Sequence, residues 1–363
     1  MKIQSIVIEN FRGIKKVEVG NFKRLNFLLG KNNACKTSIL EAIFLNIGIS
    51  NPLLSININT FRNLKHSEED DFRFIFHNLD YANKPYFHTK FDENEHERTL
   101  KIIPKKKQSI NTQLKNKNLD QEIHESIYDT QIDKNEVNGL TFDVSIKERH
   151  QKKEKYKSEI TFELASLSTT VPEDYKEKVN GVFMFPTSQA PNLDKRLEKL
   201  IVNKSHGPII ETLSLIDSSI QDLTLGTNGV IYFDIGLNRL IPINLSGDGI
   251  RRVLSILVTI ADVKNGIIVI DEIDNGLHFS SQATLIKAIL RAAEKYDVQV
   301  FATTHNYETL RKVKEVLGLA EYKNYSEDVT AFTIRKNPDN TLTAYPYSYE
   351  ELNYIIEQEI EIR

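Results

Sequence analysis

The sequence contains a single cysteine, Cys35, among its 363 residues. No disulfide can form within the chain, so a disulfide-stapled miniprotein is excluded and a reducing compartment is favoured. Long apolar stretches are lacking too. None approaches the roughly 18 consecutive apolar residues of a membrane-spanning helix, and the start of the chain, Met1–Arg12, carries Glu9 and no apolar leader. We therefore expect a soluble, cytoplasmic protein without a membrane partner.

A surplus of charge of either sign is also lacking. The chain has 47 basic and 50 acidic side chains, which gives a formal net charge of -3. No field of the whole molecule therefore attracts nucleic acid or an anionic membrane, and contact with nucleic acid would need a local patch. Hydrophobic residues at 40% and charged residues at 27% are typical of a globular protein. The length allows one large domain or two ordinary ones.

Apolar periodicity predicts α/β elements at the two ends of the chain. Near the start it predicts strands at 2–9 and 25–29 and a helix from Thr37, and in the last third alternating helices and strands at 250–261, 266–270, 278–296 and 298–303. Between them the pattern weakens, with strands expected at 72–76, 141–146, 159–164, 181–186, 230–234 and 239–243 and helical spacing over 192–217. We therefore predict a core of residues 1–50 and 225–363, interrupted by an inserted lobe at 51–224 that is β-rich over about 70–190 and helical over about 191–222.

The strongest local motif is GKNNACKT at residues 30–37, which follows an apolar strand and opens a helix. A P-loop needs this spacing because its backbone N–H groups must point at a β-phosphate, while Lys36 reaches the β and γ oxygens and Thr37 binds Mg²⁺. Cys35 replaces the usual second glycine, so loop strain or restricted phosphate approach is expected. The alternative is a chance match. The residues expected to cradle the nucleotide are Gly30, Asn32, Asn33, Ala34, Cys35, Lys36, Thr37 and Ser38.

Two further strands end in polar groups. The apolar run 266–270 is followed by Asp271 and Glu272, the arrangement by which a Walker B strand places one acid in the Mg²⁺ shell and a second beside the attacking water. The run 298–303 leads to His305, which fits a sensor of the γ-phosphate. A lone histidine at a strand end is more often a surface or capping residue, so its role depends on the P-loop.

These elements together resemble the ABC-type heads of the RecF, SMC and OLD ATPases, and most closely the stand-alone AAA family ATPases of bacterial defence and abortive-infection operons. The resemblance rests on the P-loop, on NFR at 10–12, on DEIDNGLH at 271–278 and on TTH at 303–305, and it covers roughly residues 1–50 and 225–310. It implies an α/β P-loop NTPase fold, an ABC-ATPase head with a mixed sheet that the inserted lobe interrupts, with ATP and Mg²⁺ as cofactors.

The resemblance also implies roles for single residues. Glu272, His305 and Lys36 would be catalytic, and Thr37 and Asp271 would hold Mg²⁺. The residues beside the nucleotide base would be Asn10, Phe11 and Arg12.

A glycine-rich turn at 245–249 opens a helix, as an anion site or a plain connection would. By resemblance Ser246, Gly247 and Gly249 would bind the γ-phosphate held by a second subunit, which implies a homodimer with two composite ATP sites and leaves a higher oligomer open. Asp248 departs from the family pattern by placing a carboxylate there. Arg251 or Arg252 could offset its charge, although basic residues on an amphipathic helix are usually only its solvated face. No Q-loop glutamine is placed, and His77 and Asn78 are offered instead.

The leading hypothesis is an ATPase that acts as a dimeric sensor or clamp in phage defence. Too little chain follows His305 for a TOPRIM nuclease domain, so the effector, a nuclease or toxin, is expected to be a separate protein. Two alternatives stay open: a nucleotide-binding scaffold that barely hydrolyses, and a DNA-repair ATPase resembling RecF. In the latter, the lysines at 105–107 and 152–157 would contact DNA phosphates, although a solvated loop is the simpler explanation. The tail tyrosines would anchor a partner or belong to an edge strand: Tyr345, Tyr347, Tyr349 and Tyr354.

Overall fold

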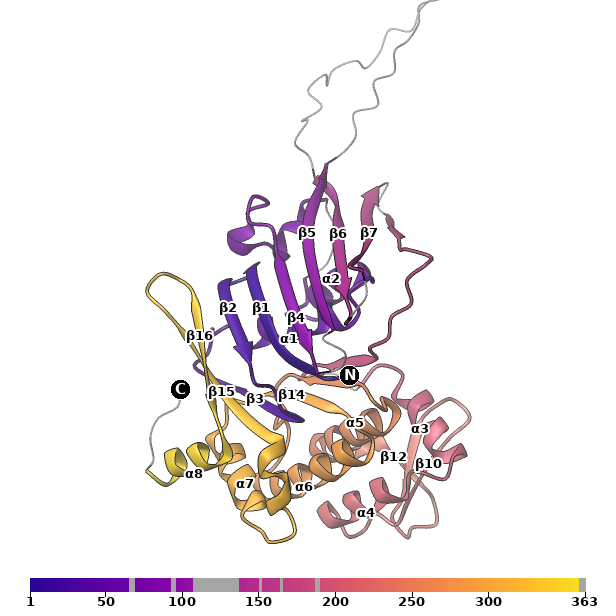
Figure 1. The fold of residues 1–363 in the computed structure, drawn as a ribbon. Coiled ribbons are helices and arrows are strands. Elements are labelled where there is room, and N and C mark those ends of the chain that lie inside the picture. Colours follow the sequence, from indigo (N-terminus) through magenta and orange to yellow (C-terminus); the bar gives the residue numbers. More distant parts are fainter. Residues whose placement is uncertain are drawn as a thin grey trace, which may run out of the picture.

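The computed structural model describes residues 1–64, 69–92, 96–106, 137–149, 152–163, 166–186 and 190–358. Two large β-sheets lie one above the other in the view of Figure 1, and helices cover the outer face of the lower sheet. The helix α1 (Lys36–Ile47) packs between the two sheets and contacts both. This layering places the start of α1 at the edge of the lower sheet.

The lower sheet has six strands in the order β16-β15-β3-β14-β13-β9. The strands from β15 to β9 run parallel to their neighbours, and β16 pairs antiparallel with β15 at one edge. A parallel sheet covered on both faces needs strands that are apolar throughout, which explains the uninterrupted apolar runs. The mixed sheet confirms the predicted α/β class. Its strands are β3 (Leu25–Leu29), β9 (Gly181–Met184), β13 (Ile267–Ile270), β14 (Gln299–Thr303), β15 (Val329–Lys336) and β16 (Leu342–Tyr347).

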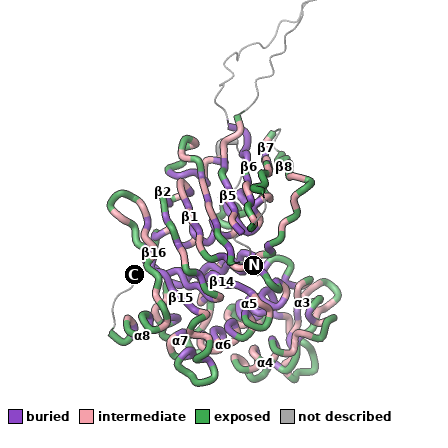
Figure 2. The backbone as a smooth tube through the Cα atoms, viewed as in Figure 1, coloured by how far each residue is buried: buried purple, intermediate pink, exposed green. Residues whose placement is uncertain are grey.

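The two faces of the lower sheet belong to different cores. Along β13, Ile268 and Ile270 pack under the outer helices, whereas Ile267 and Val269 face α1 and the upper sheet, because successive residues of a strand point to opposite faces. Figure 2 shows the buried residues concentrated between these layers. The outer helices are α5 (Asp248–Asp262), α6 (Phe279–Lys295), α7 (Tyr307–Leu317) and α8 (Tyr349–Glu357).

The upper sheet has seven antiparallel strands in the order β2-β1-β4-β5-β6-β7-β8. The pairing of β6 with β7 confirms the predicted antiparallel pair of alternating runs, although Leu164 lies outside the described residues. Pairing crosses both boundaries of the predicted insertion, since β1 pairs with β4 and β9 pairs with β13. The division into head and inserted lobe stays a prediction. The strands are β1 (Ile3–Phe11), β2 (Ile14–Gly20), β4 (Tyr86–Phe91), β5 (Glu97–Lys106), β6 (Val137–Lys147), β7 (Glu154–Glu163) and β8 (Ser166–Thr170).

Smaller elements flank these layers. The helical spacing predicted over 192–217 corresponds to two helices, α3 (Leu193–Val202) and α4 (Gly207–Ile216), which pack against α5. A three-stranded sheet follows them, made of β10 (Asp222–Leu225), β11 (Ile231–Asp234) and β12 (Ile241–Pro242). The other short elements are α2 (Leu53–Thr60), η1 (Glu69–Ile75), η2 (His77–Leu79), η3 (Ile243–Leu245) and η4 (Lys323–Asp328).

The strand predicted at 72–76 is wrong, because this segment forms most of the 3-10 helix η1. Phe72, Ile75 and Phe76 are buried, whereas Phe74 is only half buried. The alternating aromatic residues suggested a strand, but spacing of three and four residues lets one helical turn bury them together. The segment therefore needs no long partner strand.

The tail carries the four tyrosines on two elements. Tyr345 and Tyr347 lie on the edge strand β16, which confirms the edge-strand alternative for these two residues. Tyr349 and Tyr354 lie on α8, whose start is fixed by a capping box between Ser348 and Glu351.

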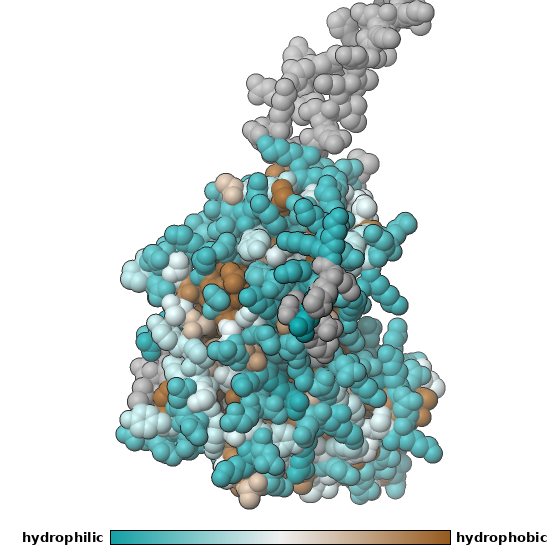
Figure 3. Space-filling model, in the orientation of Figure 1, coloured by the Kyte–Doolittle hydropathy of each residue, from teal (hydrophilic) through white to brown (hydrophobic). Residues whose placement is uncertain are grey.

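The surface is hydrophilic over most of the face in Figure 3, with small hydrophobic patches. Within the described ranges, no helix combines the length and apolar character that crossing a bilayer requires.

Candidate functional site

The loop between β3 and α1 contains several residues with positive φ. Gly30 has a φ of 138°, and a Cβ there would lie 2.7 Å from the carbonyl oxygen of Ile334, so only glycine fits. Cys35 adopts the left-handed conformation with a φ of 61°, which costs an L-residue roughly 1–2 kcal/mol. The strain expected from a cysteine at this position is therefore present in the backbone.

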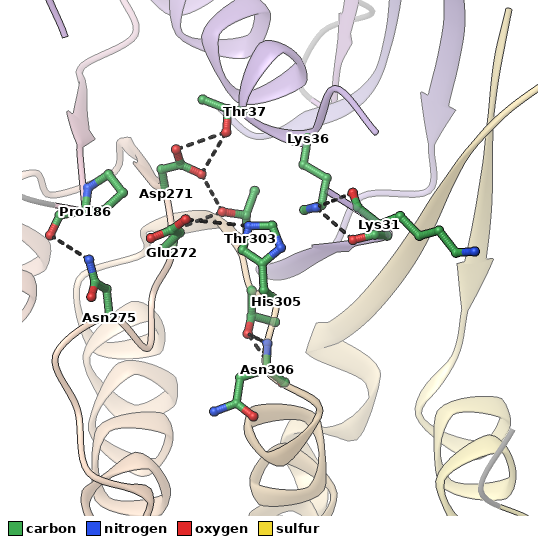
Figure 4. Close-up of polar contacts among 12 residues, drawn as sticks. Lys31, Lys36, Thr37, Pro186, Asp271, Glu272, Asn275, Thr303, His305 and Asn306 are labelled. Atoms are coloured by element: carbon green, nitrogen blue, oxygen red, sulfur yellow. Dashed lines mark hydrogen bonds and ion pairs between the residues drawn. The ribbon is translucent and has the colours of Figure 1, made fainter. Parts of the chain in front are cut away.

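Lys36 and Thr37 open α1 at the end of this loop. The ammonium of Lys36 donates to the carbonyl oxygens of Gly30 at 2.8 Å and Lys31 at 3.0 Å, and burial lowers its pKa although Asp271 opposes the shift. The Thr37 hydroxyl donates to Asp271 Oδ2 at 3.0 Å (Figure 4). Sequence segments more than 230 residues apart thus meet through one hydrogen bond.

Asp271 and Thr303 stand at the ends of the neighbouring strands β13 and β14. The Thr303 hydroxyl donates to Asp271 Oδ1 at 2.5 Å and accepts from the Glu272 backbone N–H at 2.8 Å. Carboxyl ends of parallel strands meet at one edge of a sheet, which is why these groups converge. The hydroxyl of Thr37 and the carboxylate of Asp271 are oxygen donors of the kind that Mg²⁺ prefers, so the predicted metal residues fit that ion.

Glu272 and His305 form an acid–imidazole pair beside the loop. Glu272 has a left-handed φ of 49°, and its Oε1 lies 3.6 Å from His305 Nε2. The two side chains point toward one another in Figure 4, and both are about two-fifths exposed, at 40% and 42%. A carboxylate in this position can accept a proton from water in the adjacent cavity.

That cavity has a volume of about 690 Å³ and brings together most of the predicted site. Predicted residues on its wall are Arg12, Asn32, Asn33, Ala34, Cys35, Lys36, Thr37, Ser38, Glu272 and His305. The sequence had suggested Asn78 in place of the Q-loop glutamine, and this residue also lies on the wall. Five further wall residues were not predicted from the sequence: Gly13, Arg62, Phe74, Phe76 and Leu79. A volume of this size lies within the range of small-molecule pockets.

The NFR segment contributes unequally. Arg12 reaches the cavity, whereas Phe11 is fully buried and packs edge to face on Phe87 with ring centroids 5.3 Å apart. Asn10 is not on the cavity wall. His77 does not reach the wall either, and its Nδ1 lies 2.8 Å from the Arg12 carbonyl oxygen. The base contacts predicted for Asn10 and Phe11 therefore have no side-chain support in this cavity.

A buried ionic cluster beside the P-loop was missed at the level of sequence. Glu41 on α1 is fully buried, and its two oxygens lie 2.7 Å from Arg12 Nε and 2.7 Å from Arg62 Nε. Burial raises the pKa of Glu41, although both arginines act to lower it. Burial also lowers the pKa of Arg12 to about 10. The available signal was a lone acid within an apolar helix, because such an acid is seldom buried without a partner.

Arg251 and Arg252 have separate roles. Arg251 pairs with Asp248, so the expected charge compensation is confirmed for this residue. Arg252 is buried, and its guanidinium donates to the backbone oxygens of Phe185 at 2.6 Å and Asp271 at 2.8 Å. Burial lowers the Arg252 pKa to about 10. The Arg252 side chain therefore holds the backbone at the C-terminal end of β13 in position through hydrogen bonds.

The turn before α5 lies off the cavity wall of its own chain. The Ser246 hydroxyl donates to the Ile243 carbonyl oxygen at 2.8 Å, and Gly247 is the residue before the helix. A Cβ on Gly249 would lie 2.9 Å from the Gly276 carbonyl oxygen, so this glycine allows close packing on the loop after Glu272. Contact of the three residues with a nucleotide of a second subunit stays a prediction.

The chain is similar in sequence to known proteins. A family model described as "AAA domain, putative AbiEii toxin, Type IV TA system" matches residues 25–311. The chain is 23% identical over 383 residues to a Helicobacter pylori protein named "ATP/GTP phosphatase", with 98% of each chain covered.

Two solved structures with a similar fold are SMC heads. The head domain from Thermotoga maritima aligns with a TM-score of 0.47 and 14% identity over 96% of this chain and 100% of its own. A Pyrococcus furiosus head with an extended coiled coil, bound to the C-terminal domain of ScpA, aligns with a TM-score of 0.46 and 12% identity over 99% of each chain.

Proposed function

Because the chain belongs to the AAA-domain family whose model spans residues 25–311, we propose that it hydrolyses nucleoside triphosphates, ATP in the first place, at the P-loop cavity. The observation that carries the proposal is the convergence of three motifs on one edge of the sheet: Thr37 with Asp271, Asp271 with Thr303, and Glu272 with His305. The name of the Helicobacter pylori relative supports the same reaction and adds GTP as a second substrate.

The residues of the loop bind and orient the triphosphate. Residues 32–37 line the cavity. Backbone N–H groups of this loop would donate to the β- and γ-phosphates, and the Lys36 ammonium would neutralise part of their charge. On binding, Lys36 exchanges the carbonyl oxygens of Gly30 and Lys31 for phosphate oxygens. Thr37 and Asp271 would hold Mg²⁺, which supplies charge neutralisation at the phosphate oxygens.

Glu272 then acts as the general base. A water oxygen forms a bond to the γ-phosphorus while the bond from that phosphorus to the β,γ-bridging oxygen breaks, which gives the diphosphate and inorganic phosphate. The water proton passes to the Glu272 carboxylate. His305, 3.6 Å from that carboxylate, orients it and lies where it can contact the γ-phosphate. The Thr303 hydroxyl holds the Glu272 backbone in its left-handed conformation.

We further propose that hydrolysis drives a dimeric sensor or clamp in bacterial phage defence, with a separate effector nuclease or toxin. The family description, which names a "putative AbiEii toxin" and a "Type IV TA system", supports this context. The partly exposed turn at 245–249 supports a second subunit that completes the site, because within one chain the turn lies off the cavity wall.

Steady-state phosphate release tests the hydrolysis. We expect Glu272→Gln to lower the rate about 100-fold or more while ATP binding is retained, and Lys36→Ala to remove binding. Glu308→Gln is the matched control, since it removes an exposed acid on α7 that pairs with Arg311. Equal, near-zero rates for the wild type and Glu272→Gln would instead favour a scaffold that binds nucleotide without hydrolysis.

Light scattering tests the dimer. Glu272→Gln with saturating ATP should have twice the chain mass of 41.7 kDa, and Ser246→Arg should stay monomeric because a bulky cation blocks the turn. A monomer at high protein concentration under these conditions would count against composite sites.

The described lysines give the DNA-repair alternative little support. Lys105 and Lys157 both pair with Glu159, Lys157 at 2.6 Å, so part of the basic run is already neutralised. Lys107 lies outside the described residues. A salt titration of DNA binding with Lys105 and Lys157 changed to alanine tests this alternative, because phosphate contacts would give a steep dependence on salt.

A further inference from the structure

A second cavity lies between the helices on the outer face of the lower sheet. It has a volume of about 420 Å³ and opens between α4, α5 and α6, the helices at the bottom of Figure 1. Its wall is largely apolar, and the exposed Leu215 extends the apolar surface beyond it, with 77% of that residue accessible. Apolar residues on the wall include Ile209, Leu215, Leu257, Ala288, Ala292 and Tyr322. We call this site the α4–α6 groove.

A row of cations borders the α4–α6 groove. Lys287, Arg291 and Lys295 follow each other at four-residue steps on α6, so they lie on one face of the helix and span about 12 Å. Lys287 and Arg291 lie over the ring of Tyr322 at 5.6 and 5.0 Å, and Lys295 lies over Tyr296 at 5.4 Å. These ring contacts hold the cationic side chains beside the apolar wall.

The charges of this row are poorly compensated. Arg291 pairs with Glu321 at 3.2 Å, but neither Lys287 nor Lys295 has an ion pair with any residue in the described part of the chain. Among the residues that the structure describes, Glu211 is the one acid on the groove wall. An apolar wall beside uncompensated cations is complementary to a ligand that is apolar on one side and acidic on the other.

We propose that the α4–α6 groove binds an acidic amphipathic helix of a partner protein. A helix with acids at four-residue steps places them about 6 Å apart, which matches the steps of the cation row, and its apolar residues at the intervening positions would fill the groove. An amphiphile with a single anionic head would meet one end of a row of about 12 Å and leave the lysine at the other end uncompensated. The length of the row therefore selects a polypeptide.

The groove lies along the C-terminal parts of α5 and α6, whose first turns lie near the loop that follows Glu272. The helix α5 begins beside Gly247 and reaches the groove at Leu257 and Ala261, and on the way Arg252 contacts the backbone of Asp271. The helix α6 begins at Phe279, after the loop that follows Glu272, and borders the groove from Thr284 onward. A bound helix would thus contact two helices whose other ends adjoin the loop that follows Glu272.

Fluorescence anisotropy without nucleotide tests the proposal, so its failure is distinct from a failure of hydrolysis. The probes are three labelled 18-residue helical peptides with one shared leucine face and with glutamate, glutamine or lysine on the other face. We expect saturable binding of the glutamate peptide, about tenfold tighter than the glutamine peptide and weakened by salt. The lysine peptide should not bind.

Variants locate the binding. The double variant Lys287→Glu with Lys295→Glu should weaken the glutamate peptide about tenfold or more, and Lys287→Gln with Lys295→Gln is the milder form if the reversal fails to fold. Lys90→Glu with Lys101→Glu is the matched control, because both are exposed lysines of the upper sheet, and it should change affinity less than about twofold. Ala288→Trp should block binding by filling the groove.

Three results would overturn the proposal: no saturable binding of the glutamate peptide, equal affinity for the glutamine peptide, or unchanged affinity in both lysine double variants. Sodium dodecanoate serves as the competing probe. If it binds saturably and the glutamate peptide does not, the groove takes an anionic amphiphile and the partner helix is refuted.

Discussion

Replacing Glu41 with glutamine tests the buried cluster at the wall of the nucleotide cavity. The substitution keeps the shape of the side chain and removes its charge. Arg12, whose side chain is only 9% exposed, then loses a carboxylate at 2.7 Å. Loss of one partner from a buried pair costs about 3–5 kcal/mol, because the remaining charge stays buried without compensation. Glutamine retains one oxygen acceptor, worth about 1 kcal/mol. We therefore expect the free energy of unfolding to fall by about 3 kcal/mol.

The matched variant is Arg62→Gln, which removes the other arginine. The Arg62 side chain is 37% exposed, and ion pairs at such exposure contribute less than about 1 kcal/mol. Urea unfolding followed by circular dichroism should thus separate Glu41→Gln from Arg62→Gln by about 2 kcal/mol. Both arginines line the P-loop cavity, which adds a second expectation for the state with the proposed nucleotide bound.

ATP should partly rescue Glu41→Gln. Its phosphates supply negative charge to the two arginines that have lost their carboxylate, so the variant should bind ATP more tightly than the wild type. A tenfold gain in affinity corresponds to about 1.4 kcal/mol, and at a fixed excess of ATP it adds that amount to the stabilisation. An unfolding free energy within about 1 kcal/mol of the wild type, or an ATP-induced gain equal to that of the wild type, would refute this reasoning.

Three further predictions follow from the site and its surroundings. Arg252→Lys removes the guanidinium that donates to two backbone oxygens at once, so the turnover rate should fall about tenfold with ATP affinity almost unchanged. Arg251→Lys should be neutral. A proportional loss of turnover rate and ATP affinity in Arg252→Lys would argue against a positioning role for Arg252. Burial and Arg98 lower the pKa of His96 to about 4 from 6.5, so its stabilising contribution is complete above pH 6.5 and is lost as the pH falls toward 4. His96→Gln should flatten that decline in urea titrations, and an unchanged slope would contradict the assignment. Burial raises the pKa of the Cys35 thiol, so alkylation by iodoacetamide should be slow at neutral pH and faster at higher pH. ATP bound in this loop should block the alkylation. An alkylation rate unaffected by saturating ATP would count against nucleotide binding in this loop.

The chemistry-bearing motifs could be predicted from sequence because each is a short contiguous segment with its own local geometry. Thr37 follows a strand and opens a helix, and Asp271 and Thr303 end apolar strands, so the order of elements alone places them at one sheet edge. The helical period also predicts that Arg252 is the buried arginine of α5, because it lies four and eight residues before the buried Ile256 and Ile260.

The remaining features depend on contacts between distant segments. The ionic cluster joins Arg12, Glu41 and Arg62 from three elements, and only packing shows that the two arginines share one acid. The same holds for Arg98 on β5, a fully buried side chain that pairs with Glu177 at 2.9 Å and donates to two carbonyl oxygens at the end of α1. No periodicity within one segment encodes such partners, because strand order and register are set by the whole core.

The central place of β3 in the lower sheet has a consequence for synthesis of the chain. Leu25 pairs with residues that include Val300 on one side and Val329 on the other, so its neighbours leave the ribosome roughly 300 residues after it. At about 5–20 residues per second, β3 waits on the order of 15–60 s for them. During that time an apolar segment of the nascent chain has neither ladder partner, and an unpaired apolar strand is prone to aggregation.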